Sequence, residues 1–334
     1  MAEHSDVRGG VLPPSFARER PTQGPLPGRA SLRAELVRLW LRWFLKPGKR
    51  AAGVTVEQRR RQVAAFERWT PQPPPRATIA ADVLGGIPAV RVETPASRPD
   101  RQILYLHGGG YVTGSVALYR HILWRFANAA AARVVAIDYR LAPEHPFPAA
   151  LDDAAVSWRA LIAEGADPGR TAIMGDSAGG GLTFALALRL RDEGASLPAV
   201  LIAMSPWTDL AVSGASLRHN ADADPMLSAD DVPAFARLYL AGSDPRNPYA
   251  SPLYGDPTGL PPSLIQVGGD EILRDDSVRM AERLRTAGCA VELEVWPRMP
   301  HVWQTFASMM PEARRAIARI GAFVQRHTGD SPAG

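Results

Sequence analysis

The sequence of 334 residues has little cysteine and no long hydrophobic run. Its single cysteine, Cys289, excludes an intrachain disulfide, and no Cys and His residues cluster at the spacing of a structural zinc site. We therefore expect no metal and no organic cofactor. A membrane-spanning apolar segment is missing, and so is the apolar core of a secretory signal. These absences predict a cytoplasmic protein without an integral membrane segment.

Acidic residues are scarce only near the N-terminus. The formal net charge is +4, but residues 1–70 hold 14 Lys and Arg against 6 Asp and Glu, whereas the rest of the chain holds 24 against 28. The basic excess is therefore local, and no recognition motif accompanies it. We expect no nucleic-acid partner.

The N-terminal region divides into two parts. Residues 1–30 offer almost no apolar side chains to offset chain entropy, so we predict a disordered tail. Residues 31–75 contain two helical patterns, Leu32 to Lys46 and Val56 to Trp69, which we interpret as cap helices. The first pattern is basic and amphipathic. It is typical either of a helix on a membrane surface or of a cap helix that packs its Trp and Leu face on the protein, and we favour the cap helix.

The body of the chain alternates apolar β-branched runs with helical patterns. The expected strands are residues 89–93, 103–106, 134–137, 171–174, 200–205, 263–267 and 291–295. The expected helices between and after them are residues 119–130, 149–164, 178–193, 276–287 and 311–326. Such alternation predicts an α/β fold, a mostly parallel sheet with helices on both faces.

One segment interrupts this alternation. Residues 208–260 are rich in Pro and Gly and contain one clear helical pattern, Ala229 to Leu240. Because the segment is too long for an ordinary connection, we predict a second cap segment there. The catalytic domain then comprises residues 76–207 and 261–328.

Residues 175–179 read Gly-Asp-Ser-Ala-Gly, a G-x-S-x-G motif. An expected strand enters it and an expected helix leaves it, which is the context of a nucleophile elbow. The glycines permit a strained turn that exposes the hydroxyl of Ser177. We predict Ser177 as a nucleophile.

A glycine-rich stretch, His107-Gly108-Gly109-Gly110, follows the strand expected at residues 103–106. Backbone amides without side chains can converge on an oxyanion. We predict Gly108, Gly109 and Ala178 as the donors. His107 could serve as a base, but its place inside this loop favours a structural role.

The acid and the base are expected after later strands. Asp270 follows the strand at residues 263–267 and is the predicted acid, with Asp275 and Asp276 as rivals nearer the next helix. His301 follows the strand at residues 291–295 and is the predicted general base. Ser177, Asp270 and His301 would together form a catalytic triad.

Six motifs resemble the bacterial members of the hormone-sensitive lipase family of esterases. They are HGGGY (107–111), DYRLAPEHPFPAALDD (138–153), GDSAGGG (175–181), SPW (205–207), DPMLS (224–228) and GGDEILRDD (268–276). The resemblance spans residues 102–326 and implies an eight-stranded α/β-hydrolase sheet, a helical cap, catalysis without a cofactor and a possible homodimer. It implies the same triad. Many relatives have His-Gly-Phe at the base, whereas this chain has His301-Val302-Trp303.

These observations predict a serine carboxylesterase that acts on small esters with short acyl chains. We expect Trp40 and Trp43 of the first cap helix, with residues 208–260, to enclose a limited pocket, and Tyr111, Trp207 and Val302 to form its walls. The same residues fit a lactone hydrolase or an N-acetyl hydrolase. A noncatalytic binding protein is a further alternative, since plant gibberellin receptors resemble this family but have replaced the base histidine; His301 argues for an enzyme.

Overall fold

The computed structural model describes residues 26, 28–44, 55–67 and 70–329. The tail predicted over residues 1–30 lies almost wholly outside the described residues, as do the predicted ends of both cap helices at Lys46 and Trp69.

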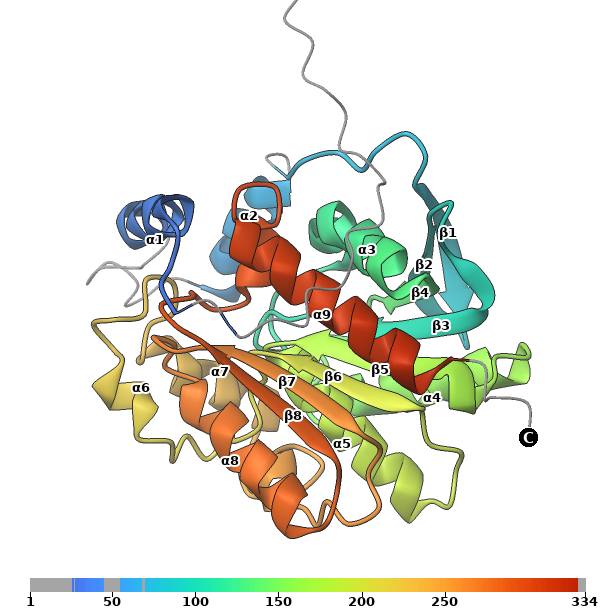
Figure 1. The fold of residues 1–334 in the computed structure, drawn as a ribbon. Helices are drawn as coiled ribbons and strands as arrows, with labels where there is room; N and C mark the ends of the chain where they lie inside the picture. Colours follow the sequence, from blue (N-terminus) through green and yellow to red (C-terminus); the bar gives the residue numbers. More distant parts are fainter. Residues whose placement is uncertain (1–25, 27, 45–54, 68–69, 330–334) are drawn as a thin grey trace, which may run out of the picture.

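The described residues form one sheet of eight strands in the order β1-β2-β4-β3-β5-β6-β7-β8 (Figure 1). Pairing is antiparallel from β1 to β2 and from β2 to β4, and parallel throughout the rest. The strands are β1(Thr78–Leu84), β2(Ile87–Glu93), β3(Arg98–Leu106), β4(Ala132–Ile137), β5(Thr171–Asp176), β6(Val200–Met204), β7(Ser263–Gly268) and β8(Val291–Trp296). The predicted fold class is confirmed.

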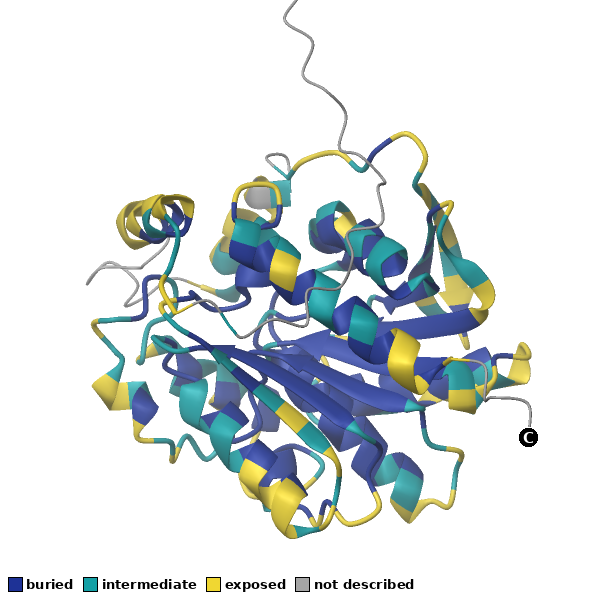
Figure 2. Cartoon of the chain, viewed as in Figure 1, coloured by how far each residue is buried: buried dark blue, intermediate teal, exposed yellow. Residues whose placement is uncertain are grey.

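Helices cover both faces of the sheet (Figure 1). One face packs against α3(Val116–Ala130) and α9(Pro311–His327), and the other against α4(Ala149–Ala163), α5(Ala178–Asp192) and α8(Arg274–Thr286). Side chains of β3 point alternately to the two faces: Ile103 and Tyr105 belong to the core under α3 and α9, whereas Leu104 and Leu106 belong to the core under α4 and α5. This two-sided burial explains the continuous apolar runs of the inner strands, which are dark blue in Figure 2.

Strand β1 is the one strand that the sequence pattern did not predict. It lies at the edge of the sheet and buries only Leu84 of its seven residues. An edge strand that faces solvent needs no apolar run, so it leaves little hydrophobic signal.

The remaining described α-helices belong to the two predicted cap segments. They are α1(Leu32–Phe44), α2(Val56–Glu67), α6(Ser216–His219) and α7(Asp231–Leu240). Helix α2 is fastened by Arg60, which donates to the Val112 carbonyl oxygen at 2.8 Å and pairs with Glu144 at 2.7 Å. The side-chain hydrogen bond from Arg60 lowers the pKa of Glu144 to about 2.

Helix α1 packs the opposite face from the one we expected. Its buried residues are Ala34, Val37, Arg38 and Leu41. Trp40 and Trp43 are 41% and 81% exposed, so the prediction that they enclose a pocket is wrong. The small and aliphatic side chains allow close approach to the body of the protein, and the bulky side chains face outward.

Gly321 marks a close approach of α9 to α3. A Cβ at this position would lie 2.2 Å from the carbonyl oxygen of Ala129. We expect Gly321→Ala to lower the free energy of unfolding by about 1–3 kcal/mol in urea denaturation, because the two helices must separate. Arg315→Ala, on the exposed side of α9, is the matched control with an expected effect within about 0.5 kcal/mol. Equal effects of the two substitutions would refute the close-packing argument.

Candidate active site

Ser177 lies in a strained turn between β5 and α5. Its φ is 51°, a left-handed value that is unfavourable for a residue with a side chain. A Cβ at Gly175 would lie 2.2 Å from the Gly179 carbonyl oxygen, and a Cβ at Gly179 would lie 2.0 Å from that of Leu106. Both motif glycines are therefore required by close backbone contacts, and the turn has the geometry of a nucleophile elbow.

His301 is held by a glutamate. Its Nδ1 lies 2.7 Å from Oε2 of Glu271, and both side chains are buried. The other oxygen of Glu271 accepts hydrogen bonds from the Ser205 hydroxyl at 2.7 Å and from the Gly268 amide at 2.5 Å. Ser205 Oγ in turn accepts from the Val302 amide at 3.1 Å, so it links the carboxylate to the residue after His301.

The prediction of Asp270 as the partner of His301 is therefore corrected to Glu271. The chain turns tightly after β7, where the Glu271 amide donates to the Gly268 carbonyl oxygen, and this turn directs the Glu271 side chain back toward the sheet. Asp270 instead accepts a hydrogen bond from Arg38 of α1 at 2.7 Å. Arg38 also donates to the carbonyl oxygen of Arg298, in the loop that leads to His301.

The rival acids also have other partners. Asp275 accepts from the Ser216 amide at 2.8 Å, and Asp276 accepts from the amides of Thr208 and Asp209 at 2.8 and 2.9 Å. These contacts fasten the second cap segment to α8. Burial raises the pKa of Asp276 to about 8.

The oxyanion-donor prediction needs one correction. The Gly108 amide donates to Oδ1 of Asp176 at 3.0 Å, so it is already engaged. The described hydrogen bonds include none donated by the amides of Gly109 and Gly110, whose φ values are 125° and 65°. Ala178 is the first residue of α5, where an amide has no acceptor within the helix. The Gly110 amide, which the sequence analysis did not name, is thus available in place of the Gly108 amide.

Asp176 and His107 shape the glycine loop. Asp176 accepts hydrogen bonds from the hydroxyls of Tyr105 and Tyr119 at 2.6 and 2.8 Å, and burial raises its pKa. The ring of His107 stacks on Tyr139 with centroids 4.3 Å apart, and its Nδ1 lies 2.7 Å from the Gly108 carbonyl oxygen. These contacts favour the structural role that we expected for His107.

The three predicted wall residues are all buried. The ring centroids of Tyr111 and Trp207 lie 6.2 Å apart, and Tyr111 also stacks on Tyr239 of α7 at 3.8 Å. Val302 follows His301 directly and has a φ of 48°. Their role as pocket walls stays a prediction, and Tyr239 joins the same aromatic cluster without a sequence signal that could have identified it.

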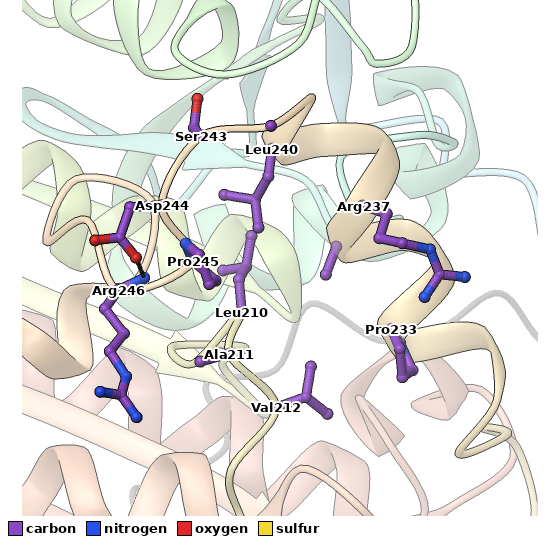
Figure 3. Close-up of a pocket in the computed structure, with 12 residues that line it drawn as sticks. Leu210, Ala211, Val212, Pro233, Arg237, Leu240, Ser243, Asp244, Pro245 and Arg246 are labelled. Carbon is purple, nitrogen blue, oxygen red and sulfur yellow. Dashed lines mark hydrogen bonds between the residues drawn. The ribbon is translucent and has the colours of Figure 1, made fainter.

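A separate groove of about 970 Å³ lies on the second cap segment (Figure 3). Its lining comprises Leu210, Ala211, Val212, Pro233, Ala236, Arg237, Leu240, Gly242, Ser243, Asp244, Pro245 and Arg246. Arg237 and Arg246 lie on opposite sides of it in Figure 3. Ser177, Glu271 and His301 do not line this groove.

The environment of His301 favours its protonated form. Burial lowers the pKa of the imidazole, but the charge of Glu271 and its hydrogen bond act in the opposite direction and leave the pKa raised above 6.5. A carboxylate on Nδ1 also fixes the tautomer, so that Nε2 is free to accept a proton.

The described residues include no group of three or more His, Cys, Asp or Glu side chains arranged to hold a metal ion. No described helix combines the length and the hydropathy that crossing a bilayer requires.

Comparison with known proteins identifies the family of the chain. A family model described as the alpha/beta hydrolase fold matches residues 103–305. The chain is 47% identical to an acetyl-hydrolase of Streptomyces hygroscopicus, and the match covers 71% of this chain and 79% of that relative. It is 38% identical to a carboxylesterase of Mycobacterium tuberculosis, and that match covers 75% of this chain and 81% of the relative. A crystal structure of an esterase from the bacterial hormone-sensitive lipase family is 43% identical, with a TM-score of 0.85 over 90% of this chain and all of that chain. The chain therefore belongs to the bacterial hormone-sensitive lipase family of α/β-hydrolases, and it is a carboxylic ester hydrolase.

Proposed function

We propose that the protein is a serine carboxylesterase in which Ser177 is the nucleophile, His301 the general base and Glu271 the acid of the triad. The observation that carries this proposal is the buried 2.7 Å contact between Glu271 and His301 Nδ1. A nucleophile on an elbow, a base after the last strand and a carboxylate on that base form the constellation of serine hydrolases.

The proposed reaction proceeds through an acyl-enzyme. His301 Nε2 takes the proton of the Ser177 hydroxyl as Oγ attacks the ester carbonyl carbon, and the amides of Gly109, Gly110 and Ala178 stabilise the oxyanion. The C–O bond to the alcohol then breaks, and His301 protonates the leaving oxygen. Water, deprotonated by His301, attacks the acyl carbon and releases the carboxylic acid and Ser177.

The substrate that we propose is a small ester with a short acyl chain. Tyr111, Trp207 and Tyr239 form a packed aromatic cluster beside the glycine loop, and their burial supports a confined pocket over an open lipid-binding face. A lactone or an N-acetyl group is the alternative, and the similarity to a protein named acetyl-hydrolase supports an acetyl group as the group removed. A noncatalytic role has less support, because the base histidine and its carboxylate are both present.

Two sequence-based expectations remain predictions. One is a cytoplasmic location, supported by the single cysteine. The other is a homodimer, which the resemblance to the family implies.

The nucleophile and the substrate class are tested together. We expect hydrolysis of p-nitrophenyl esters to peak at short acyl chains and to fall by about 10⁴-fold or more in Ser177→Ala, because the triad acts as a unit. Parallel assays with a lactone and an N-acetyl amide identify the alternatives. Near-full activity in folded Ser177→Ala would exclude this nucleophile, and rates that rise beyond about ten carbons would exclude a confined pocket.

The acid is tested by two neighbouring substitutions. We expect Glu271→Gln to lower kcat by about 10³- to 10⁴-fold, because the imidazolium loses its carboxylate and its fixed tautomer. Asp270→Asn is the matched control and should lower kcat by less than about tenfold, since Asp270 contacts Arg38 and not His301. The reverse order of losses would restore Asp270 as the acid.

The raised pKa of His301 predicts the pH dependence of the reaction. Only neutral imidazole can accept the serine proton, so kcat/KM should fall as the pH drops through an apparent pKa above 6.5. Glu271→Gln removes the charge that raises this pKa, so NMR titration of His301 should give a lower pKa in the variant than in the wild type. An unchanged or higher pKa in the variant would contradict the Glu271 contact.

A further inference from the structure

Helix α1 has two apolar faces, and among the described residues only the inner face is covered. The inner face buries Ala34, Val37 and Leu41 against the body of the protein. The outer face carries large apolar side chains that are 41% to 85% exposed: Leu32, Leu36, Leu39, Trp40, Trp43 and Phe44. Figure 2 shows this outer face in yellow. These six side chains of the outer face are among nine large hydrophobic residues that are exposed in the described part of the chain.

The stretch of sequence that contains α1 is strongly basic. Residues 29–50 contain seven Arg and Lys and one acidic residue, Glu35. Arg33 and Arg42 are exposed on α1, whereas Arg38 is buried and paired with Asp270. The apolar patch is thus flanked by cations that face solvent.

We propose that the outer face of α1 docks on the surface of an anionic lipid bilayer. Trp, Phe and Leu with flanking Arg are the composition of helices that lie in the membrane interface. At about 1.5 Å per residue, the 13 residues of α1 extend about 20 Å, which is too short to span a bilayer but suits a helix lying flat on one. Basic residues near the surface add electrostatic attraction to anionic headgroups.

The basic charge beside the outer face of α1 favours an anionic lipid bilayer over a second copy of the chain as its binding partner. Two α1 helices placed face to face would bring two basic segments together, and like charges destabilise such a contact. An anionic lipid surface instead neutralises them.

Docking through α1 would place the lipid surface close to the catalytic loops. The inner face of the same helix contacts the loop after β7 through Arg38 and Asp270. It contacts the loop after β8 through Glu35 and Arg298, which pair at 2.5 and 2.9 Å. These loops carry Glu271 and His301, so a docked molecule would hold its active site near esters dissolved in the membrane.

The test is flotation of the full-length protein with vesicles of phosphatidylcholine containing phosphatidylglycerol, compared with vesicles of phosphatidylcholine alone. We expect the wild type to float with the anionic vesicles and to be released in 0.5 M NaCl, since salt screens the attraction. The double variant Leu36→Ser, Trp43→Ser should bind the vesicles about tenfold or more weakly than the wild type, because the removed side chains supply apolar area. The double variant Arg33→Glu, Arg42→Glu should bind the anionic vesicles more weakly than the wild type, with no change in its binding to vesicles of phosphatidylcholine alone.

Two controls separate this inference from the proposed chemistry. Val83→Ser removes an exposed apolar side chain from β1, at the opposite end of the molecule, and should bind vesicles like the wild type (Figure 1). Ser177→Ala should also bind normally, and the Leu36 and Trp43 variant should retain the rate on soluble p-nitrophenyl acetate.

Three results would overturn the proposal. They are a wild type that does not float with anionic vesicles, an α1 variant that binds as well as Val83→Ser, and a wild-type dimer in light scattering that the α1 substitutions convert to a monomer. The last result would assign the face to a second copy of the chain.

Discussion

At Ser177 the chain leaves β5 with a left-handed backbone and enters α5 without room for a Cβ at Gly175 or Gly179. The carbonyl oxygens that would collide there include those of Leu106 and His107, at the end of β3. Close backbone packing therefore sets the glycine loop against the elbow. Ser177 and the Ala178 amide lie beside the loop that supplies Gly109 and Gly110, and the remaining parts of the site are arranged around this contact.

Buried polar contacts then fix the acid and the base. The carboxylate of Glu271 is buried away from solvent, but both of its oxygens have hydrogen-bond partners, which are Ser205, Gly268 and His301. Such pairing offsets the cost of a buried charge and leaves the carboxylate little freedom to move. The site is therefore organised before a substrate binds, which is the condition for electrostatic catalysis.

Helix α1 connects this site to the surface. Its inner face reaches both catalytic loops through Arg38 and Glu35, while its outer face presents Trp and Leu to solvent. A helix can carry two such roles because residues about 100° apart around its axis separate into distinct faces. The same 13 residues thus hold the catalytic loops on one side and form an apolar patch on the other.

The sequence by itself determined the α/β alternation, the family motifs, Ser177 on its elbow and His301 after the last strand, because strand periodicity and turn chemistry are local. Only the tertiary structure decided which of two adjacent acids meets His301, since a turn of a few residues directs the Asp270 and Glu271 side chains to different partners. It also decided that the Gly108 amide is engaged by Asp176 and that the Trp face of α1 points outward. Hydrogen-bond partners and the covered side of a two-faced helix depend on segments distant in the sequence, and a pattern read along one segment does not contain them.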